Sequence, residues 1–122
     1  MKTKNKKWDL KRSRLKYHLK NKNINALPRL VVFRSNSNIF TQLIDDGAHK
    51  TILSASSIDK ENRALILKAK SKIEKSTIVG NCIAEKMKDK KIDKIIFDRN
   101  GYKYHGRIKA VGDAIRNADI KI

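Results

Sequence analysis

The feature that most limits how this chain can fold is the uneven distribution of its charge. The 122 residues carry 30 Lys and Arg against 12 Asp and Glu, a formal net charge of +18. Residues 1–22 hold ten of the basic side chains and one acid, so half of the net charge lies on less than a fifth of the chain. Such a segment repels itself and has little apolar surface to bury. The sequence therefore predicts a basic N-terminal arm, residues 1–27, followed by one folded domain, residues 28–122.

The same charge indicates a polyanionic partner, either nucleic acid or an anionic membrane surface. The longest apolar runs, residues 30–33 and 64–67, have four residues each, whereas about 20 are needed to cross a bilayer. The single cysteine, Cys82, excludes an intramolecular disulfide, and the scattered histidines have no metal-ligand spacing. We therefore expect a nucleic-acid partner, with no membrane, no metal, no cofactor and no small-molecule substrate.

Within the arm, helix-forming residues run from Trp8 to about Lys20 and place Trp8, Leu15 and Leu19 on a thin apolar stripe. A short helix with so narrow a stripe is marginal in isolation. We expect it to form when its basic face meets phosphates. A solvated charged helix and a mitochondrial transit peptide, which also lacks acids, are the alternatives.

The first part of the domain has the pattern of three strands. Residues 29–35, 39–44 and 51–57 are rich in β-branched and aromatic side chains. They are separated by turn residues at 35–38 and 45–47. Short turns join neighbouring strands in opposite directions. The pattern predicts an antiparallel meander.

Helical patterns and one further strand complete the domain. Residues 59–72 are polar and predict a loop with partial helix, after which Ser76 is a suitable N-cap. Gly80 inside the following helix predicts close packing on the sheet. The apolar face of that helix is Val79, Cys82, Ile83 and Met87, the short buried strand is Ile95–Phe97, and the apolar face of the last helix is Ile108, Val111, Ile115 and Ala118. This order predicts an α/β fold, with a fourth strand completing a mixed sheet packed by helices.

The connection between that strand and the last helix, residues 98–107, is the most informative segment. Ligand sites of α/β folds lie where strands give way to helices, and a helix N-terminus offers free N–H groups to phosphate. Arg99, Lys103 and Arg107 can pair with phosphates or base edges. Tyr102, Tyr104 and His105 can stack on unpaired bases or reach sugar hydroxyls. Some residues of this segment have structural roles instead of binding roles. We expect Asp98 to orient Arg99 or cap an amide, and at least one tyrosine to pack beneath the loop.

Arg29, Arg34 and the turn from Ser35 to Asn38 form a second candidate surface for RNA, although an arginine at a strand end is more often solvated than functional.

A catalytic role has little support in the sequence. Asp45, Asp46, Glu74 and Asp98 are the carboxylates that a two-metal nuclease would need. However, Asp45–Gly47 is ordinary turn sequence, and no phosphate-binding glycine loop or nucleophile–base set occurs. We expect a non-enzymatic protein, with a metal-dependent nuclease as the alternative and a DNA-architectural protein as a third class.

Five segments carry a family resemblance. They are PRLVVFRSN (28–36), IFTQLIDD (39–46), ILSAS (52–56), VGNCIAE (79–85) and FDRNGYKYHGRIKA (97–110). In this order they resemble bacterial-type large-subunit ribosomal protein eighteen, over nearly the whole chain. The arm departs from the family in using Lys where relatives often have Arg.

The resemblance implies a structural constituent of the large ribosomal subunit. Members of the family bind 5S rRNA, help to attach it to 23S rRNA and lie in the central protuberance beside ribosomal protein five, in the cytoplasm of bacteria or the matrix of organelles. Their fold resembles a ribonuclease-H-like sandwich without the catalytic carboxylates. The RNA-binding residues that the charge pattern and the resemblance together indicate are Lys6, Lys7, Lys11, Arg12, Arg14, Lys16, Arg29, Arg34, Ser35, Asn36, Arg99, Asn100, Tyr102, Tyr104, His105 and Arg107.

Overall fold

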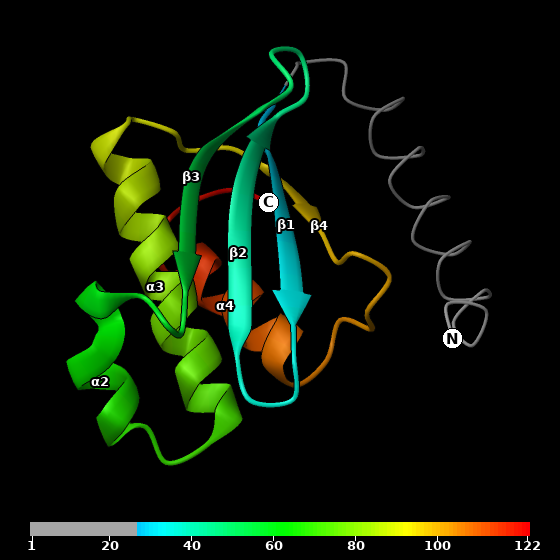
Figure 1. Ribbon diagram of the computed structural model, residues 1–122. Coiled ribbons are helices and arrows are strands. Elements are labelled where there is room, and N and C mark those ends of the chain that lie inside the picture. The colour runs from blue at the N-terminus through cyan, green and yellow to red at the C-terminus, as the bar shows by residue number, and fades with distance from the viewer. Residues whose placement is uncertain (1–26) are drawn as a thin grey trace.

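The computed structural model describes residues 27–122, which form a mixed sheet covered by helices (Figure 1). Residues 1–26 of the predicted arm, with Lys6, Lys7, Lys11, Arg12, Arg14 and Lys16, lie outside the described residues. The elements are β1 (Arg29–Arg34), β2 (Ile39–Asp45), β3 (Lys50–Ser56), the 3-10 turn η2 (Lys60–Asn62), α2 (Arg63–Lys68), α3 (Lys72–Asp89), β4 (Ile96–Asp98) and α4 (Arg107–Asn117). The predicted α/β class, the meander and the fourth strand are confirmed.

The four strands lie in the order β3-β2-β1-β4. Strands β1, β2 and β3 pair antiparallel, with Val32 opposite Thr41 and Gln42 opposite Ser54. Strand β4 pairs parallel with β1, with Leu30 opposite Phe97. A parallel neighbour requires a crossover connection, which α2 and α3 provide. Strand β1 is therefore central, and its C-terminal end lies beside the chain that leaves β4.

The hydrophobic core lies between the sheet and the two long helices, which cover the same face in Figure 1. Leu30, Val32 and Leu43 reach it from the sheet, and Ile83 and Val111 from α3 and α4; all are fully buried. The alternation of the strands and the helical spacing of the apolar residues produce this single core. No helix among residues 27–122 is long and apolar enough to cross a membrane.

The N-cap of α3 lies five residues before the predicted cap. Ser71 is the N-cap: its Oγ accepts the Glu74 N–H at 3.2 Å, and the Glu74 carboxylate accepts the Lys70 N–H at 2.6 Å. This serine-to-glutamate spacing is a capping box. The prediction of Ser76 as the cap is wrong, because Ser76 is buried in the second turn and its hydroxyl donates to the Lys72 carbonyl at 2.9 Å.

Gly80 packs closely, but against α4 and not against the sheet as predicted. A Cβ at this position would lie 2.7 Å from the Ala114 Cβ and 2.9 Å from the Val111 carbonyl oxygen. Both are closer than side chains tolerate, so the glycine sets the distance between α3 and α4. That distance fixes where the N-terminus of α4 emerges beside the sheet.

Candidate nucleic-acid interface

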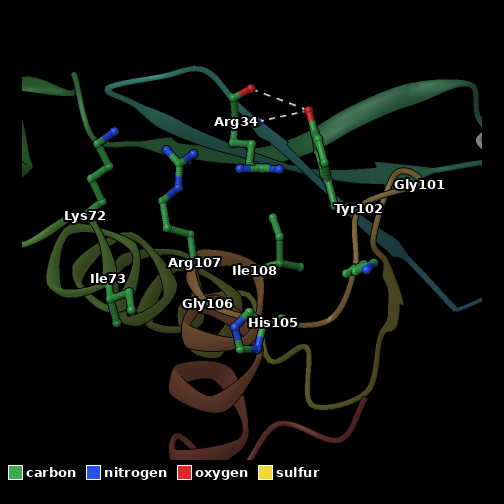
Figure 2. Close-up of a pocket in the computed structure, with 10 residues that line it drawn as sticks. Arg34, Lys72, Ile73, Gly101, Tyr102, His105, Gly106, Arg107 and Ile108 are labelled. Carbon is green, nitrogen blue, oxygen red and sulfur yellow. Dashed lines mark hydrogen bonds between the residues drawn. The ribbon is translucent and has the colours of Figure 1, made fainter. Parts of the chain in front are cut away.

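Three segments that are distant in sequence meet at the C-terminal end of β1. They are the β1–β2 turn, the loop of residues 99–106 with the start of α4, and the start of α3. Between them lies an open pocket of about 650 Å³ (Figure 2). Its lining comprises Arg34, Lys72, Ile73, Gly101, Tyr102, Lys103, His105, Gly106, Arg107 and Ile108. Four of these are Lys or Arg, and no carboxylate belongs to the lining that the described residues provide.

Tyr102 joins the loop to the end of β1. Its hydroxyl accepts the Arg34 N–H and donates to the Arg34 carbonyl, each at 3.4 Å. The Arg34 guanidinium lies 4.8 Å from the centre of the same ring, a cation–π contact. The side chain of Arg34 is exposed. The tyrosine therefore holds a cation at the rim of the pocket and leaves its donors accessible.

Arg107 holds the β1–β2 turn against α4. Its guanidinium donates to the Ser35 carbonyl at 2.8 Å. The turn itself is closed by two hydrogen bonds: the Ser35 N–H donates to the Asn38 carbonyl, and the Asn38 N–H donates to the Ser35 Oγ. Partial burial and repulsion from the Arg34 charge both lower the pKa of Arg107. The two cations are thus held together against their mutual repulsion. An anion placed between them would relieve it.

The N-terminus of α4 opens into the same pocket. Gly106 is its N-cap, with φ +56°, and makes no side-chain capping hydrogen bond. A positive φ favours glycine, and the missing cap leaves first-turn N–H groups available at the positive end of the helix dipole. Together with Arg107 on the first turn, this end of α4 suits a phosphate group.

Lys72 is a member of the site that sequence reasoning missed. It begins α3, and its ammonium donates to Asn36 Oδ1 at 3.3 Å. Figure 2 shows Lys72, Arg107 and Arg34 following one another along the pocket. One lysine in a lysine-rich chain gives no signal by itself. The capping box at Ser71 would have placed Lys72 on the first turn of a helix.

Two predicted residues do not lie on the expected surface. Arg29 is 4% exposed, and Asn100 is 2% exposed. The Arg29 guanidinium donates to both Asp46 carboxylate oxygens at 3.0 Å and to Asp98 Oδ2 at 2.5 Å. Burial alone would lower the pKa of Arg29, but the two carboxylates outweigh it and raise that pKa. Arg29 therefore holds β1 to the start of the 99–106 loop.

Asp98 and Tyr104 take the structural roles considered for them. Asp98 Oδ1 accepts the Asn100 N–H at 2.8 Å, which caps an amide as expected, and its other oxygen binds Arg29, not Arg99. The Tyr104 ring meets Phe97 edge-on at 5.8 Å, and its hydroxyl accepts a hydrogen bond from Arg116 at 2.8 Å. Burial raises the pKa of Tyr104. These groups shape the loop from beneath.

Arg99 faces a different part of the surface from the main pocket. It lines a second, open pocket of about 430 Å³ together with Phe97, Tyr104 and Arg116. Arg116 also lies 5.5 Å from the centre of the Tyr104 ring. His105 and Arg107 line the main pocket instead. The loop therefore presents cations in two directions, with Tyr104 packed between them.

The carboxylates considered for a nuclease are separated by their partners. Asp46 and Asp98 are bridged by the Arg29 guanidinium. Asp45 Oδ1 closes its own turn by accepting the Gly47 and Ala48 N–H groups. Glu74 caps α3. Within residues 27–122 no three carboxylate, His or Cys side chains gather as a metal would require.

An acid-free cationic pocket beside an uncapped helix N-terminus, with a tyrosine and a histidine in its lining, defines a nucleic-acid-binding protein. The chain also matches, over residues 2–122, the family described as ribosomal L18 of archaea, bacteria, mitochondria and chloroplasts. It therefore belongs to the ribosomal L18 family.

Curated relatives agree with this assignment. The chain is 54% identical over 93 residues to large ribosomal subunit protein uL18 of Fusobacterium nucleatum, which covers 76% of this chain and 75% of the relative. It is 42% identical over 120 residues to that of Finegoldia magna, covering 95% and 98%. The family makes this chain a structural, rRNA-binding component of the large ribosomal subunit, with a role in translation.

Proposed function

We propose that this protein binds 5S rRNA and helps to attach it to 23S rRNA in the central protuberance, beside ribosomal protein five. The observation that carries the proposal is the acid-free pocket where Arg34, Lys72 and Arg107 meet the open end of α4. The family supplies the ribosomal setting. The same proposal places the protein in ribosomes of the bacterial cytoplasm or an organellar matrix.

The contacts divide by chemistry. Arg34, Lys72 and Arg107 bind phosphates around the N-terminus of α4, and Tyr102 and His105 offer rings to unpaired bases. Ser35 and Asn36 lie on the exposed turn beside Arg34, and Arg99 reaches RNA from the second pocket. The arm, residues 1–27, folds on the RNA and neutralises further phosphates through Lys6, Lys7, Lys11, Arg12, Arg14 and Lys16. Arg29, Asn100 and Tyr104 support this surface from within or beneath it.

The likeness to a ribonuclease-H-like sandwich stays a prediction. A nuclease activity has no observation in its favour, because Arg29 occupies the space between Asp46 and Asp98.

The test is binding of the full chain to a 5S rRNA transcript, followed by hydroxyl-radical footprinting. We expect tighter binding to 5S rRNA than to an unrelated structured RNA of equal length or to duplex DNA at the same salt concentration. Protection should be lost in Arg107→Ala and retained in Lys109→Ala, which changes an exposed cation on α4 outside the pocket. Equal affinity for all three nucleic acids would contradict the proposal.

A further inference from the structure

A third depression, separate from the two pockets described above, lies between α2 and α3. In Figure 1, α2 stands on one flank of the molecule and the loop between β4 and α4 on the other. The depression is an open groove of about 450 Å³. We call it the α2–α3 groove; its lining comprises Glu61, Asn62, Leu65, Ile78, Asn81, Cys82, Glu85, Lys86 and Asp89.

The segment that supplies Leu65 to the groove carries apolar side chains that the fold does not bury. Helix α2 (RALILK) has no buried residue. Leu65 is 56% exposed, Leu67 79% and the preceding Ile58 63%, which makes this short segment the source of most exposed large hydrophobic residues among those described. Grouped exposure of this kind is typical of a surface that meets another macromolecule. Leu65 and Ile78 supply apolar contact within the groove itself.

The charge of the groove is opposite to that of the rest of the protein. Its lining holds three carboxylates and one ammonium group, in a chain whose net charge is +18. The ammonium, from Lys86, lies 2.6 Å from Glu61 Oε1, and this contact lowers the pKa of Glu61. Glu85 and Asp89 form no ion pair with any other described residue. RNA would be repelled here, whereas a cation would be attracted.

We propose that the α2–α3 groove docks a lysine- or arginine-bearing segment of a neighbouring large-subunit protein. The segment places an apolar side chain against Leu65 and Ile78 and its cations against Glu85 and Asp89. Rim charges of this kind mainly select the partner and its orientation, and the buried apolar contact provides affinity. The protein then has two faces, one for RNA and one for protein. The inference rests on family membership and not on which rRNA is bound.

The test is site-specific photocross-linking in purified large subunits that contain the full-length chain. Benzoylphenylalanine replaces Asn81, an exposed residue of the groove, or Lys103, an exposed residue of the cationic pocket. We expect the probe at Asn81 to attach to a lysine- or arginine-rich peptide of another ribosomal protein, identified by mass spectrometry. The probe at Lys103 should attach to rRNA.

A matched pair of charge reversals tests the electrostatic part. Glu85→Lys and Asp93→Lys each exchange one exposed acid for a base, but only Glu85 lines the groove. Glu85→Lys should lower the Asn81 cross-link yield about fivefold or more, because an attractive contact becomes repulsive. Asp93→Lys should leave the yield unchanged. Incorporation into subunits is measured for both variants, so that yields are compared per incorporated chain.

The other possible occupants are distinguishable outcomes. An Asn81 adduct with rRNA, with residues 1–26 of the same chain or with a second copy would overturn the proposal. So would the absence of an adduct, or a protein adduct that Glu85→Lys does not weaken. A Lys103 probe that attaches to no rRNA would instead contradict the proposed function and leave the groove unaffected.

Discussion

The two arginines at the ends of β1 are five residues apart in sequence and have opposite surroundings. Arg29 is 4% exposed and lies between Asp46 and Asp98, the second of which is only 1% exposed. Arg34 is exposed and stacks on Tyr102. It lines a pocket in which none of the described lining residues is a carboxylate. One charge is balanced inside the protein and the other is not.

The difference shows which cations of a very basic chain serve the fold and which serve a ligand. A buried cation requires paired carboxylates, because an unpaired charge in the interior is costly. A cluster of exposed cations without acids costs less in water, but its members repel each other; at Arg107, partial burial first and then repulsion from Arg34 lower the pKa. Such a cluster is neutralised when a polyanion binds. Charge balance therefore separates the structural from the functional arginines.

The largest expected effect is on the stability of the protein when Arg29, the arginine paired with carboxylates, is replaced. Arg29→Met should lower the free energy of unfolding by about 3–5 kcal/mol, because it removes the cation that faces the buried Asp98 carboxylate and the partly buried Asp46 carboxylate. Urea denaturation of the full chain measures the loss. Arg34→Met is the matched control and should change stability by less than about 1 kcal/mol. Similar losses in both variants would remove the distinction between the two ends.

The next largest effect is on RNA affinity when one of the cations of the main pocket, Arg34 or Arg107, is replaced. Arg34→Ala and Arg107→Ala should each weaken 5S rRNA binding by about 1–3 kcal/mol. Arg99→Ala should act in the same range through the second pocket, and Lys4→Ala should do little. Stability should hardly change in Arg107→Ala, because the bond to the Ser35 carbonyl that it removes lies at the exposed surface. Filter binding at constant salt concentration measures the 5S rRNA affinity of each variant, and Lys109→Ala is the control, whose affinity should stay close to that of the unmodified protein.

A smaller, more specific effect is on salt dependence. The logarithm of the binding constant should fall linearly with the logarithm of salt concentration, with a slope of about −0.7 to −0.9 for each phosphate contact. Arg107→Ala should reduce the magnitude of that slope by about 1. A variant at Arg29, measured where it remains folded, should keep the full slope. A flat response of the unmodified protein would contradict phosphate binding altogether.

The smallest effect is on the pH dependence of stability and comes from the solvent-exposed ion pair between Glu61 and Lys86. The pKa of Glu61 is lowered from 4.5, first by its hydrogen bond with Lys86 and then by that charge. A lowered folded-state pKa gives stability that is present above the unfolded value and is lost as pH falls through the folded value. Glu61→Gln should therefore be slightly less stable at pH 7, and the difference should vanish well below pH 4.5. A difference that persisted in acid would assign it to packing instead of charge.

Much of the fold could be predicted from local pattern. The alternating strands, the short turns and the apolar helix faces predicted the meander, the mixed sheet and both long helices, and the interleaved basic and aromatic residues of 98–107 indicated the loop of the candidate site. One error arose because the residue's partner is distant in sequence, and another because a local signal was overlooked. The sequence predicts that Gly80 packs on the sheet, because nothing near it in sequence indicates that its neighbour is α4. The only cap predicted for α3 is Ser76, whereas the decisive local signal is Ser71 with a glutamate three residues later.

The sequence by itself determined that the chain carries a large excess of positive charge, where strands and helices alternate, and which loop is rich in groups that recognise RNA. Those properties depend on residue type and short-range spacing. Only the tertiary structure decided that Arg29 is neutralised by Asp46 and Asp98, that Lys72 joins Arg34 and Arg107, and that Glu85 and Asp89 border the α2–α3 groove. The reason is that the energy of a charge depends on its burial and on its nearest opposite charge, and folding sets both.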